Sequence, residues 1–325
     1  EISLGLVGSE MCIRDRCQDA WKLFEDNGID VVFDPAKEFP AYTTEEIENH
    51  PDREDIVAAL IGMDDFRDER KYQALPNLKA VAKFGVGVDN IDGELAKKYG
   101  VKALNAPGQN SNAVAELTVA MILDLLRHVM PLHKDMEKGL WTRFIGSEIK
   151  GKTVGLLGFG AIARLVAKKL QCFNVEVIAF DLYPNEQAAK EIGVRMTTQE
   201  EVITKSDIVS IHIPAMPETH HLFNKETIAS MKDGAYLINP ARGALVDLDA
   251  VAEALTSGKL AGAAMDAFEV EPLPLDSPIL KCENIVLTPH TGAETKESYY
   301  NVSMTTARDI IKVIKGEEPE HCVNK

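Results

Sequence analysis

The chain has 325 residues, of which 45% are hydrophobic and 26% are charged, and its formal net charge is −16. This length predicts about two domains, since one domain usually holds roughly 100–200 residues. The negative charge argues against binding to nucleic acid or an anionic membrane surface, and no stretch reaches the run of about 20 apolar residues that spans a membrane.

The first sixteen residues differ in character from the rest of the chain. The segment SLGLVGSEMCIRDR, Ser3–Arg16, resembles the translation of a sequencing-library adapter, which favours a non-native origin for residues 1–16. The alternative is a native strand at Leu4–Val7 followed by a loop. The segment lacks a basic stretch followed by an apolar one, so no signal peptide is predicted.

From Ala20 onward, short β-branched runs alternate with amphipathic stretches, the pattern of βα units in a parallel sheet. A first series of four strands is predicted at Asp30–Phe33, Val57–Ile61, Leu78–Phe84 and Val101–Leu104. A long helix, roughly Asn112 to Lys138, follows this series. Its centre is apolar nearly all round, so we expect it to be buried between layers or against another subunit.

A second series of six strands follows, the number expected for a complete dinucleotide-binding sheet. These strands are predicted at Thr153–Leu157, Val175–Phe180, Ile208–Ile213, Ala235–Asn239, Gly262–Asp266 and Ile285–Thr288. A last helix, about Thr295 to Lys315, is expected to return to the first domain. The predicted division is a substrate domain of residues 1–104 plus 295–325 and a nucleotide-binding domain of residues 105–294.

A glycine-rich turn marks the predicted nucleotide site. In the sequence TVGLLGFGAIA, Gly158 permits a tight turn after a strand, and Gly160 lets the backbone approach a pyrophosphate. The helix that follows offers unpaired N–H groups to phosphates at its start. Asp181 ends the next strand, where a carboxylate can accept hydrogen bonds from both ribose hydroxyls and would repel a 2′-phosphate. The pattern therefore favours NAD over NADP.

Three residues follow successive strands of the second series and make a candidate reaction centre: Arg242, Glu271 and His290. Ligands of open α/β sheets bind at the carboxyl ends of the strands. A guanidinium can hold the carboxylate and ketone oxygens of a 2-oxo acid, and an imidazolium can donate the proton that an alkoxide needs after hydride addition. A neighbouring carboxylate would orient that imidazole and favour its charged form. Singly, each residue could equally be a surface ion pair, a loop cap or a solvated side chain.

In this order the motifs KFGVGVDNID, NAPGQNSNAVAELT, LLGFGAIA, INPARGALVD, MDAFEVEPLP and LTPHTG resemble those of the D-isomer-specific 2-hydroxyacid dehydrogenases, most closely the D-3-phosphoglycerate dehydrogenase branch. The resemblance covers about Ala20 to Asn324. It implies an α/β fold of two Rossmann-like domains, a flavodoxin-like substrate domain and a doubly wound NAD-binding domain, with the active site in the cleft between them. It also implies a homodimer.

The resemblance further implies roles for individual residues. Arg242 would bind and polarise the substrate, His290 would be the general acid/base, and Glu271 would pair with His290. The implied substrate contacts are Lys83, Gly85, Val86, Gly87 and Asn110. The implied cofactor contacts are Gly158, Gly160, Ala161, Ile162, Asp181, Ile213, Pro214, Thr219, Pro240, Ala241, Asp266 and His290.

Two departures from the family pattern bear on the cofactor and on the substrate. Ala161-Ile162 stands where similar enzymes have an Arg-Ile or similar pair, so one pyrophosphate salt bridge is expected to be missing. Met63 stands where phosphoglycerate dehydrogenases have an arginine, although Lys83 would keep one positive charge near the phosphate. The match therefore supports the reaction class better than 3-phosphoglycerate itself. A glyoxylate or hydroxypyruvate reductase is an alternative, as is an NAD(H)-sensing corepressor-like binding protein. No C-terminal regulatory domain is expected.

The remaining histidines and the cysteines are given no catalytic role. His212, His220 and His221 lie near one another in HIPAMPETHH, but no carboxylate or cysteine lies at metal-ligand spacing, so no metal site is predicted. The five cysteines are odd in number and scattered, which predicts free thiols in a reducing cytosol.

Overall fold

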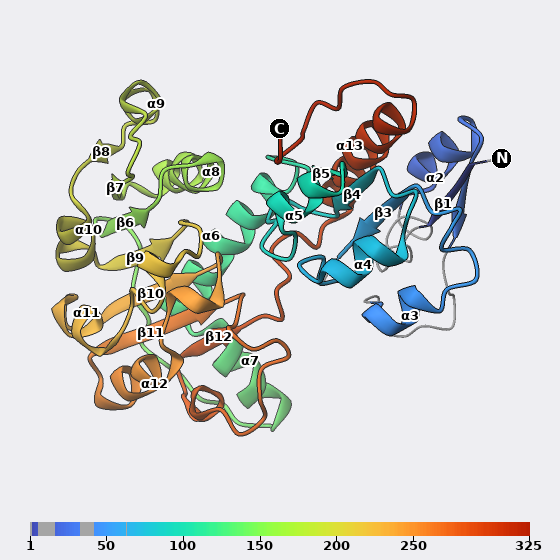
Figure 1. Ribbon diagram of the computed structural model, residues 1–325. Coiled ribbons are helices and arrows are strands. Elements are labelled where there is room, and N and C mark those ends of the chain that lie inside the picture. Colours follow the sequence, from blue (N-terminus) through green and yellow to red (C-terminus); the bar gives the residue numbers. More distant parts are fainter. Residues whose placement is uncertain (1, 6–16, 33–41, 63) are drawn as a thin grey trace. The chain divides into compact units, whose positions relative to one another are not determined.

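The computed structural model describes residues 2–5, 17–32, 42–62 and 64–325 (Figure 1). The chain folds into two compact units, which we call unit 1 (Glu1–Asn110 and Ala293–Lys325) and unit 2 (Ser111–Gly292). Most strands in both units run parallel to their neighbours with helices between them, so the predicted α/β class is confirmed. Within the described ranges, no helix combines the length and the apolar character that crossing a membrane would need.

Unit 1 contains two small parallel sheets. The strands β1 (Ile2–Gly5) and β2 (Ile29–Val32) form one sheet, while β3 (Ala58–Ile61), β4 (Ala80–Lys83) and β5 (Lys102–Leu104) form the other in the order β3-β4-β5. Strand β1 lies inside the suspected leader, where the alternative expectation was a strand, and residues 6–16 lie outside the described residues. The helices of the unit are α2 (Gln18–Glu25), α3 (Thr44–Glu48), α4 (Glu69–Ala74), α5 (Gly93–Lys98) and α13 (Lys296–Ile314).

The last helix of the chain belongs to the core of unit 1. Ala307 and Ile310 of α13 are completely buried and share a hydrophobic cluster with Phe24 of α2 and with Leu60 and Ala82 of the central strands. Thr295 caps the start of α13 by accepting a hydrogen bond from the backbone N–H of Ser298. Burying a large apolar side chain contributes about 1.5–3 kcal/mol, so this cluster fixes the strands whose ends carry the loops described below.

Unit 2 contains one parallel sheet of seven strands in the order β12-β11-β10-β9-β6-β7-β8. Its strands are β6 (Thr153–Leu157), β7 (Glu176–Phe180), β8 (Arg195–Met196), β9 (Ile208–Ile211), β10 (Ala235–Asn239), β11 (Leu260–Met265) and β12 (Ile285–Leu287). The helices that accompany it are α6 (Ser111–Arg127), α7 (Val129–Glu137), α8 (Ala161–Leu170), α9 (Glu186–Ile192), α10 (Gln199–Lys205), α11 (Lys225–Ser230) and α12 (Leu248–Ser257).

The prediction of six strands in this sheet was wrong. The sequence pattern missed β8, which has only two residues and is exposed at Arg195, so it carries almost no hydrophobic signal. With β8 counted, the first six strands of the unit follow the spatial order 3-2-1-4-5-6 of a dinucleotide-binding fold, and β12 is a seventh strand beyond it.

The prediction of one long helix over residues 112–138 was also wrong. Helix α6 ends at Arg127, His128 takes the left-handed conformation with φ 54°, and α7 starts at Val129. Asp124 accepts a hydrogen bond from the N–H of Met130 in the first turn of α7. Pro131 has no N–H to donate to the carbonyl of Arg127, as a continuous helix would require. This proline was the sequence signal for the break.

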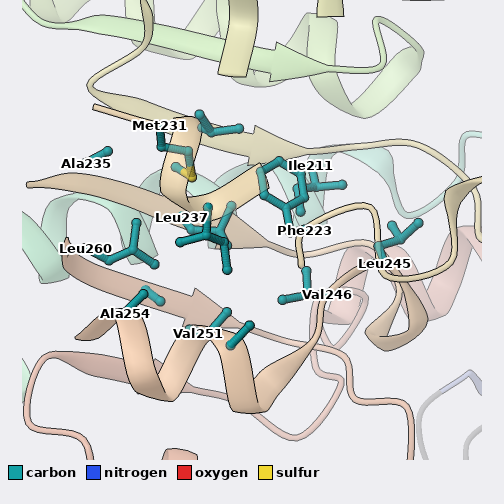
Figure 2. Packing of buried hydrophobic residues seen from close by; sticks show 14 of the residues in the cluster. Ile211, Phe223, Met231, Ala235, Leu237, Leu245, Val246, Val251, Ala254 and Leu260 are labelled. Carbon is teal, nitrogen blue, oxygen red and sulfur yellow. The ribbon is translucent and has the colours of Figure 1, made fainter. Parts of the chain in front are cut away.

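The central strands β9 and β10 of unit 2 are buried on both faces, as expected for a sheet between two helix layers. All five residues of β10 are buried: Leu237 belongs to the hydrophobic cluster on one face, while Tyr236 and Ile238 belong to the cluster on the other. Figure 2 shows the first cluster, in which Leu237 lies with Phe223 and with Val251 of α12. This packing holds the carboxyl ends of the strands in place.

Candidate active site

The turn between β6 and α8 requires glycine. Gly158 has φ +90°, and a Cβ atom there would lie 2.5 Å from the carbonyl oxygen of His212. Gly160 is the N-cap of α8, and a Cβ there would meet no atom within 4 Å. The backbone at Gly160 therefore borders open space at the start of a helix, where N–H groups and the helix dipole favour an anion. These residues fit a dinucleotide pyrophosphate.

Asp181 lies at the carboxyl end of β7 and joins the glycine turn to that strand. Its Oδ2 atom accepts a hydrogen bond of 2.7 Å from the N–H of Phe159, and its Oδ1 atom accepts one of 2.8 Å from the N–H of Tyr183. A carboxylate offers about four acceptor sites, so two remain for the hydroxyls of a ribose. The position and charge of Asp181 thus fit the predicted role toward NAD.

Arg242 lies in the loop after β10, and a buried asparagine shapes that loop. The Nδ2 atom of Asn239 donates to the carbonyl of Arg242 at 2.8 Å, while its Oδ1 atom accepts from the N–H of Ala241 at 3.1 Å. The guanidinium donates through Nη1 to the carbonyl of Ala241 at 2.8 Å. Asn239 was not singled out in the sequence, although its place between an apolar strand and PARG was a usable signal.

His290 and Glu271 are in contact. The Nδ1 atom of His290 lies 3.1 Å from Oε1 and 3.0 Å from Oε2 of Glu271, and Oε1 also accepts a hydrogen bond from the N–H of Phe268. His290 has φ 54°, and its side chain is about half exposed. Because Nδ1 faces the carboxylate, Nε2 is the ring nitrogen that is directed elsewhere and can meet a substrate. The sequence predicted this pair from the chemistry of the two residues, and the resemblance implied the same pair.

Asp266 holds the loop that carries His290. Its buried carboxylate accepts hydrogen bonds from the hydroxyl of Thr288 at 2.6 Å and from the N–H groups of Thr291 and Gly292 at 2.8 Å each. The residues on both sides of His290 are therefore fixed to β11. Asp266 was expected near the nicotinamide, and the described contacts give it this supporting role in the loop.

The loops of Arg242 and Glu271 touch through their backbones. A Cβ atom on Gly243 would lie 1.9 Å from the carbonyl carbon of Phe268 and 2.1 Å from the nitrogen of Glu269. Only glycine allows this approach, which places the segment after Arg242 directly against the segment before Glu271. Unit 2 thus gathers the loops of the predicted catalytic residues at one end of its sheet.

The other predicted cofactor positions of unit 2 also lie just past strand ends. Ala161 and Ile162 open α8, while Ile213 and Pro214 follow β9. The hydroxyl of Thr219 accepts from the N–H of Met216 at 2.9 Å and donates to the carbonyl of Pro214 at 3.0 Å, which closes this loop. The remaining positions, Pro240 and Ala241, lie between β10 and Arg242.

The predicted substrate residues of unit 1 surround the loop after β4. Lys83 donates from Nζ to the carbonyl of Gly62, and Asn105 donates to the carbonyl of Val86 at 2.8 Å. Gly85 has φ +147°, a conformation that glycine adopts readily. The Oδ1 atom of Asn110 is buried and has no hydrogen-bond partner in the described part of the chain. Met63 lies outside the described residues.

The histidines after β9 are not simply solvated. The Nε2 atoms of His220 and His221 lie 3.0 and 2.9 Å from the two carboxylate oxygens of Glu269, and these hydrogen bonds lower the pKa of Glu269. The carboxylate that the local sequence lacked therefore comes from another loop. His212 is different: burial lowers its pKa to about 3, and its Nε2 atom lies 2.9 Å from the hydroxyl of Ser210.

Comparisons with known proteins find similar sequences and structures. The family model for the NAD-binding domain of D-isomer-specific 2-hydroxyacid dehydrogenases matches residues 119–292. A glyoxylate reductase of Thermofilum pendens is 39% identical over 91% of this chain and 88% of its own length. A D-3-phosphoglycerate dehydrogenase of Bacillus subtilis is 43% identical over 76% of this chain, which spans only 47% of that relative. The apo structure of D-lactate dehydrogenase from Escherichia coli, 27% identical, superposes with a TM-score of 0.86 over 99% of both chains.

Proposed function

Because the chain belongs to the family of D-isomer-specific 2-hydroxyacid dehydrogenases, we propose that its Arg242, Glu271 and His290 interconvert a D-2-hydroxy acid and its 2-oxo acid. Membership confirms the family that the motifs predicted, and with it an NAD-dependent oxidoreductase whose unit 2 holds the NAD-binding domain. The observation that carries the proposal is the contact between His290 and Glu271. The segment before Glu271 also packs against the loop of Arg242.

The chemistry divides among the three side chains. NAD, when bound, accepts or supplies a hydride. Arg242 binds the carboxylate of the substrate and polarises its C2 oxygen with a fixed fork of N–H donors. During reduction His290 donates a proton from Nε2 to that oxygen, and during oxidation it removes the proton again. Glu271 holds the ring through Nδ1, which fixes the tautomer and the orientation of the ring.

The proposed nucleotide contacts rest on the glycine turn and on Asp181. Gly158 and Gly160 leave the backbone accessible to the pyrophosphate, and the carboxylate of Asp181 has acceptor sites left for the ribose. Ala161 and Ile162 offer backbone N–H groups in the first turn of α8 without a cationic side chain. A 2′-phosphate would be repelled by Asp181, so we expect NADH to be preferred over NADPH.

For the substrate we propose a small 2-oxo acid, with glyoxylate and hydroxypyruvate ahead of the phosphorylated substrate. The glyoxylate reductase of Thermofilum pendens is 39% identical over 91% of this chain and 88% of its own length. Met63 also stands where the resemblance places the arginine of phosphoglycerate dehydrogenases. In unit 1, Gly85, Val86 and Gly87 form a loop whose backbone N–H groups are suited to bind a carboxylate. Lys83 and Asn110 complete the proposed substrate contacts.

The test is a panel of 2-oxo acids, glyoxylate, hydroxypyruvate, pyruvate and 3-phosphohydroxypyruvate, assayed by loss of NADH absorbance with NADPH in parallel. We expect turnover with NADH, and a loss of about 10²–10⁴-fold in kcat for His290→Ala. Full turnover by that variant would refute the proton-transfer role. Tight NADH binding without turnover of any acid would instead support the corepressor-like alternative.

We also propose a homodimer, formed through α7 and the segment after it. Large hydrophobic side chains are exposed there, with Trp141 at 82% and Ile145 at 98% of their full accessible surface. The other members of this surface are Val129, Met130, Met136, Leu140 and Phe144. A monomer rarely exposes so many large apolar groups together. Light scattering after size-exclusion chromatography should give twice the chain mass of 35.7 kDa.

We propose a cytosolic location for the enzyme. The four cysteines among the described residues, Cys17, Cys172, Cys282 and Cys322, are free thiols. Free thiols persist in the reducing cytosol and are paired more often in secreted proteins. Detection of the chain in the soluble cytosolic fraction of its own cells would support this location, and export would contradict it.

A further inference from the structure

His220, His221 and Glu269 form a cluster in unit 2 that the proposed reaction does not use. The ligand atoms of the three side chains, one from each residue, all lie within 4.8 Å of one another. Each Nε2 atom lies against a different oxygen of the one carboxylate, at 3.0 Å for His220 and 2.9 Å for His221. We propose that this cluster binds a divalent transition-metal ion, with Zn²⁺ as the ion it fits best.

The set of ligands selects the class of ion. Two imidazoles and one carboxylate suit Zn²⁺, Co²⁺ or Ni²⁺, whereas Mg²⁺ and Ca²⁺ prefer a shell of oxygen atoms. Three protein ligands leave the fourth position of a tetrahedral Zn²⁺ ion to water. The three side chains are between 36% and 49% exposed, so an ion and its water can reach them from solvent.

The backbone places both imidazoles on the same side. Side chains of consecutive residues in an extended chain point in opposite directions. His221 instead has φ 48°, a conformation that is uncommon outside glycine, and its N–H donates to the carbonyl of Ala244 at 2.8 Å. As a result the rings of His220 and His221 stack, with centroids 4.0 Å apart and planes 20° apart. Both Nε2 atoms therefore face Glu269.

The three ligand atoms lie close enough for the side chains to close on an ion. Zn–N and Zn–O bonds of about 2.0–2.2 Å at a tetrahedral angle separate the ligand atoms by about 3.4 Å. Each Nε2 atom now lies 2.9–3.0 Å from its own oxygen of Glu269, and the ligand atoms, one from each residue, lie within 4.8 Å of one another. The backbone of Glu269 is fixed by its contact with Gly243, so the adjustment falls on the exposed side chains.

An ion at this site would join two loops of unit 2. The histidines belong to the segment after β9, while Glu269 belongs to the loop that continues to Glu271. Three protein–metal bonds would replace two hydrogen bonds between these loops. The bound ion should therefore stabilise unit 2 as well as occupy the cluster.

The experiment is isothermal titration of the untagged, metal-free full chain with ZnCl₂, without substrate or NAD. A titration with CoCl₂ is followed by visible absorption, which reports the coordination of Co²⁺. We expect one ion per chain in addition to any weak surface binding. Binding should weaken at least tenfold in Glu269→Gln and in the double variant His220→Ala/His221→Ala.

The matched control is His133→Ala, because His133 pairs with Glu137 at 3.6 Å on α7 and belongs to no group of three potential ligands among the described residues. This variant should bind Zn²⁺ as the unmodified chain does. The inference is overturned if the unmodified chain shows no saturable binding of one ion, or if binding is undiminished in Glu269→Gln and the double variant. Circular dichroism of each variant verifies folding, and the reaction proposed above does not enter the measurement.

Discussion

Unit 2 contains two regions that are built in different ways. The nucleotide half, residues 153–196, relies on its backbone: two glycines open the turn after β6, and Asp181 accepts hydrogen bonds from backbone N–H groups. The reaction half, residues 235–292, relies on side chains carried by loops, above all the pair of His290 and Glu271. The difference teaches that the proposed contacts to the pyrophosphate and ribose and the proposed proton transfer depend on separate residues. Substitutions should therefore separate KM for NADH from kcat.

Gly243→Ala should have the largest effect, because it forces the loops of the reaction half apart. The new Cβ atom would meet the backbone of Phe268 and Glu269 at about 2 Å, where no flexible side chain can give way. We expect a loss of more than about 3 kcal/mol in the free energy of unfolding, measured in urea, and a loss of activity. The control Gly93→Ala, whose Cβ would lie 3.5 Å from the Cβ of Asn324, should stay within about 1 kcal/mol of the unmodified chain. Equal stability of the two variants would contradict the close packing.

Glu271→Gln should break the reaction half while leaving the nucleotide half intact. The amide keeps the shape of the side chain but no longer offers a charged acceptor to Nδ1 of His290. We expect kcat to fall about 10²-fold, with KM for NADH changed by less than about threefold. Steady-state kinetics with saturating 2-oxo acid provides both constants. Glu253→Gln, in an exposed pair with Lys225, is the matched control and should keep full activity.

Asp181→Asn should weaken cofactor binding by the nucleotide half while leaving the reaction half intact. The amide can still accept one backbone hydrogen bond, but it no longer repels a 2′-phosphate and holds the ribose less well. We expect KM for NADH to rise about tenfold with kcat nearly unchanged, and KM for NADPH to fall. Initial rates with both cofactors make the measurement. A fall in kcat without a change in either KM would show that Asp181 serves the reaction half instead.

The same contrast explains which parts of the site could be predicted from the sequence. The glycine turn and Asp181 follow from local patterns, since each residue acts within a few positions of the strand that carries it. The cluster of Glu269 with His220 joins side chains 49 residues apart in the chain. Nothing in the local pattern reveals such a contact, because His220 follows β9 and Glu269 follows β11, two strands that β10 separates in the sheet. The support of Arg242 by Asn239 was missed although Asn239 ends an apolar strand, a position that indicates a buried amide.

The errors in the elements have equally local causes. Strand β8 is two residues long, too short for a hydrophobic period, and the helix break at His128 is made by one left-handed residue. Long buried strands such as β10 were predicted at their observed bounds because both faces carry apolar side chains. The fold class and the order of the main strands were thus readable. The two-residue edge strand β8 was not, and the helix break at His128 was missed although Pro131 indicated it.

His212→Gln should have the smallest effect, which we expect in the pH dependence of stability. His212 follows the strand that joins the two halves. It follows β9, which pairs with β6 on one side and β10 on the other, and its carbonyl lies against Gly158. Burial lowers the pKa of His212 to about 3, below the ordinary value of 6.5, because the charged ring would lose its hydration. Between these pKa values the unfolded chain binds the proton and the folded chain does not, so stability falls as the pH falls below 6.5. We expect the unmodified chain to lose about 0.8 kcal/mol relative to His212→Gln between pH 8 and pH 6, measured by urea unfolding at both pH values. An equal pH dependence in both proteins would show that His212 becomes protonated in the folded state and that the joining strand is open to solvent there.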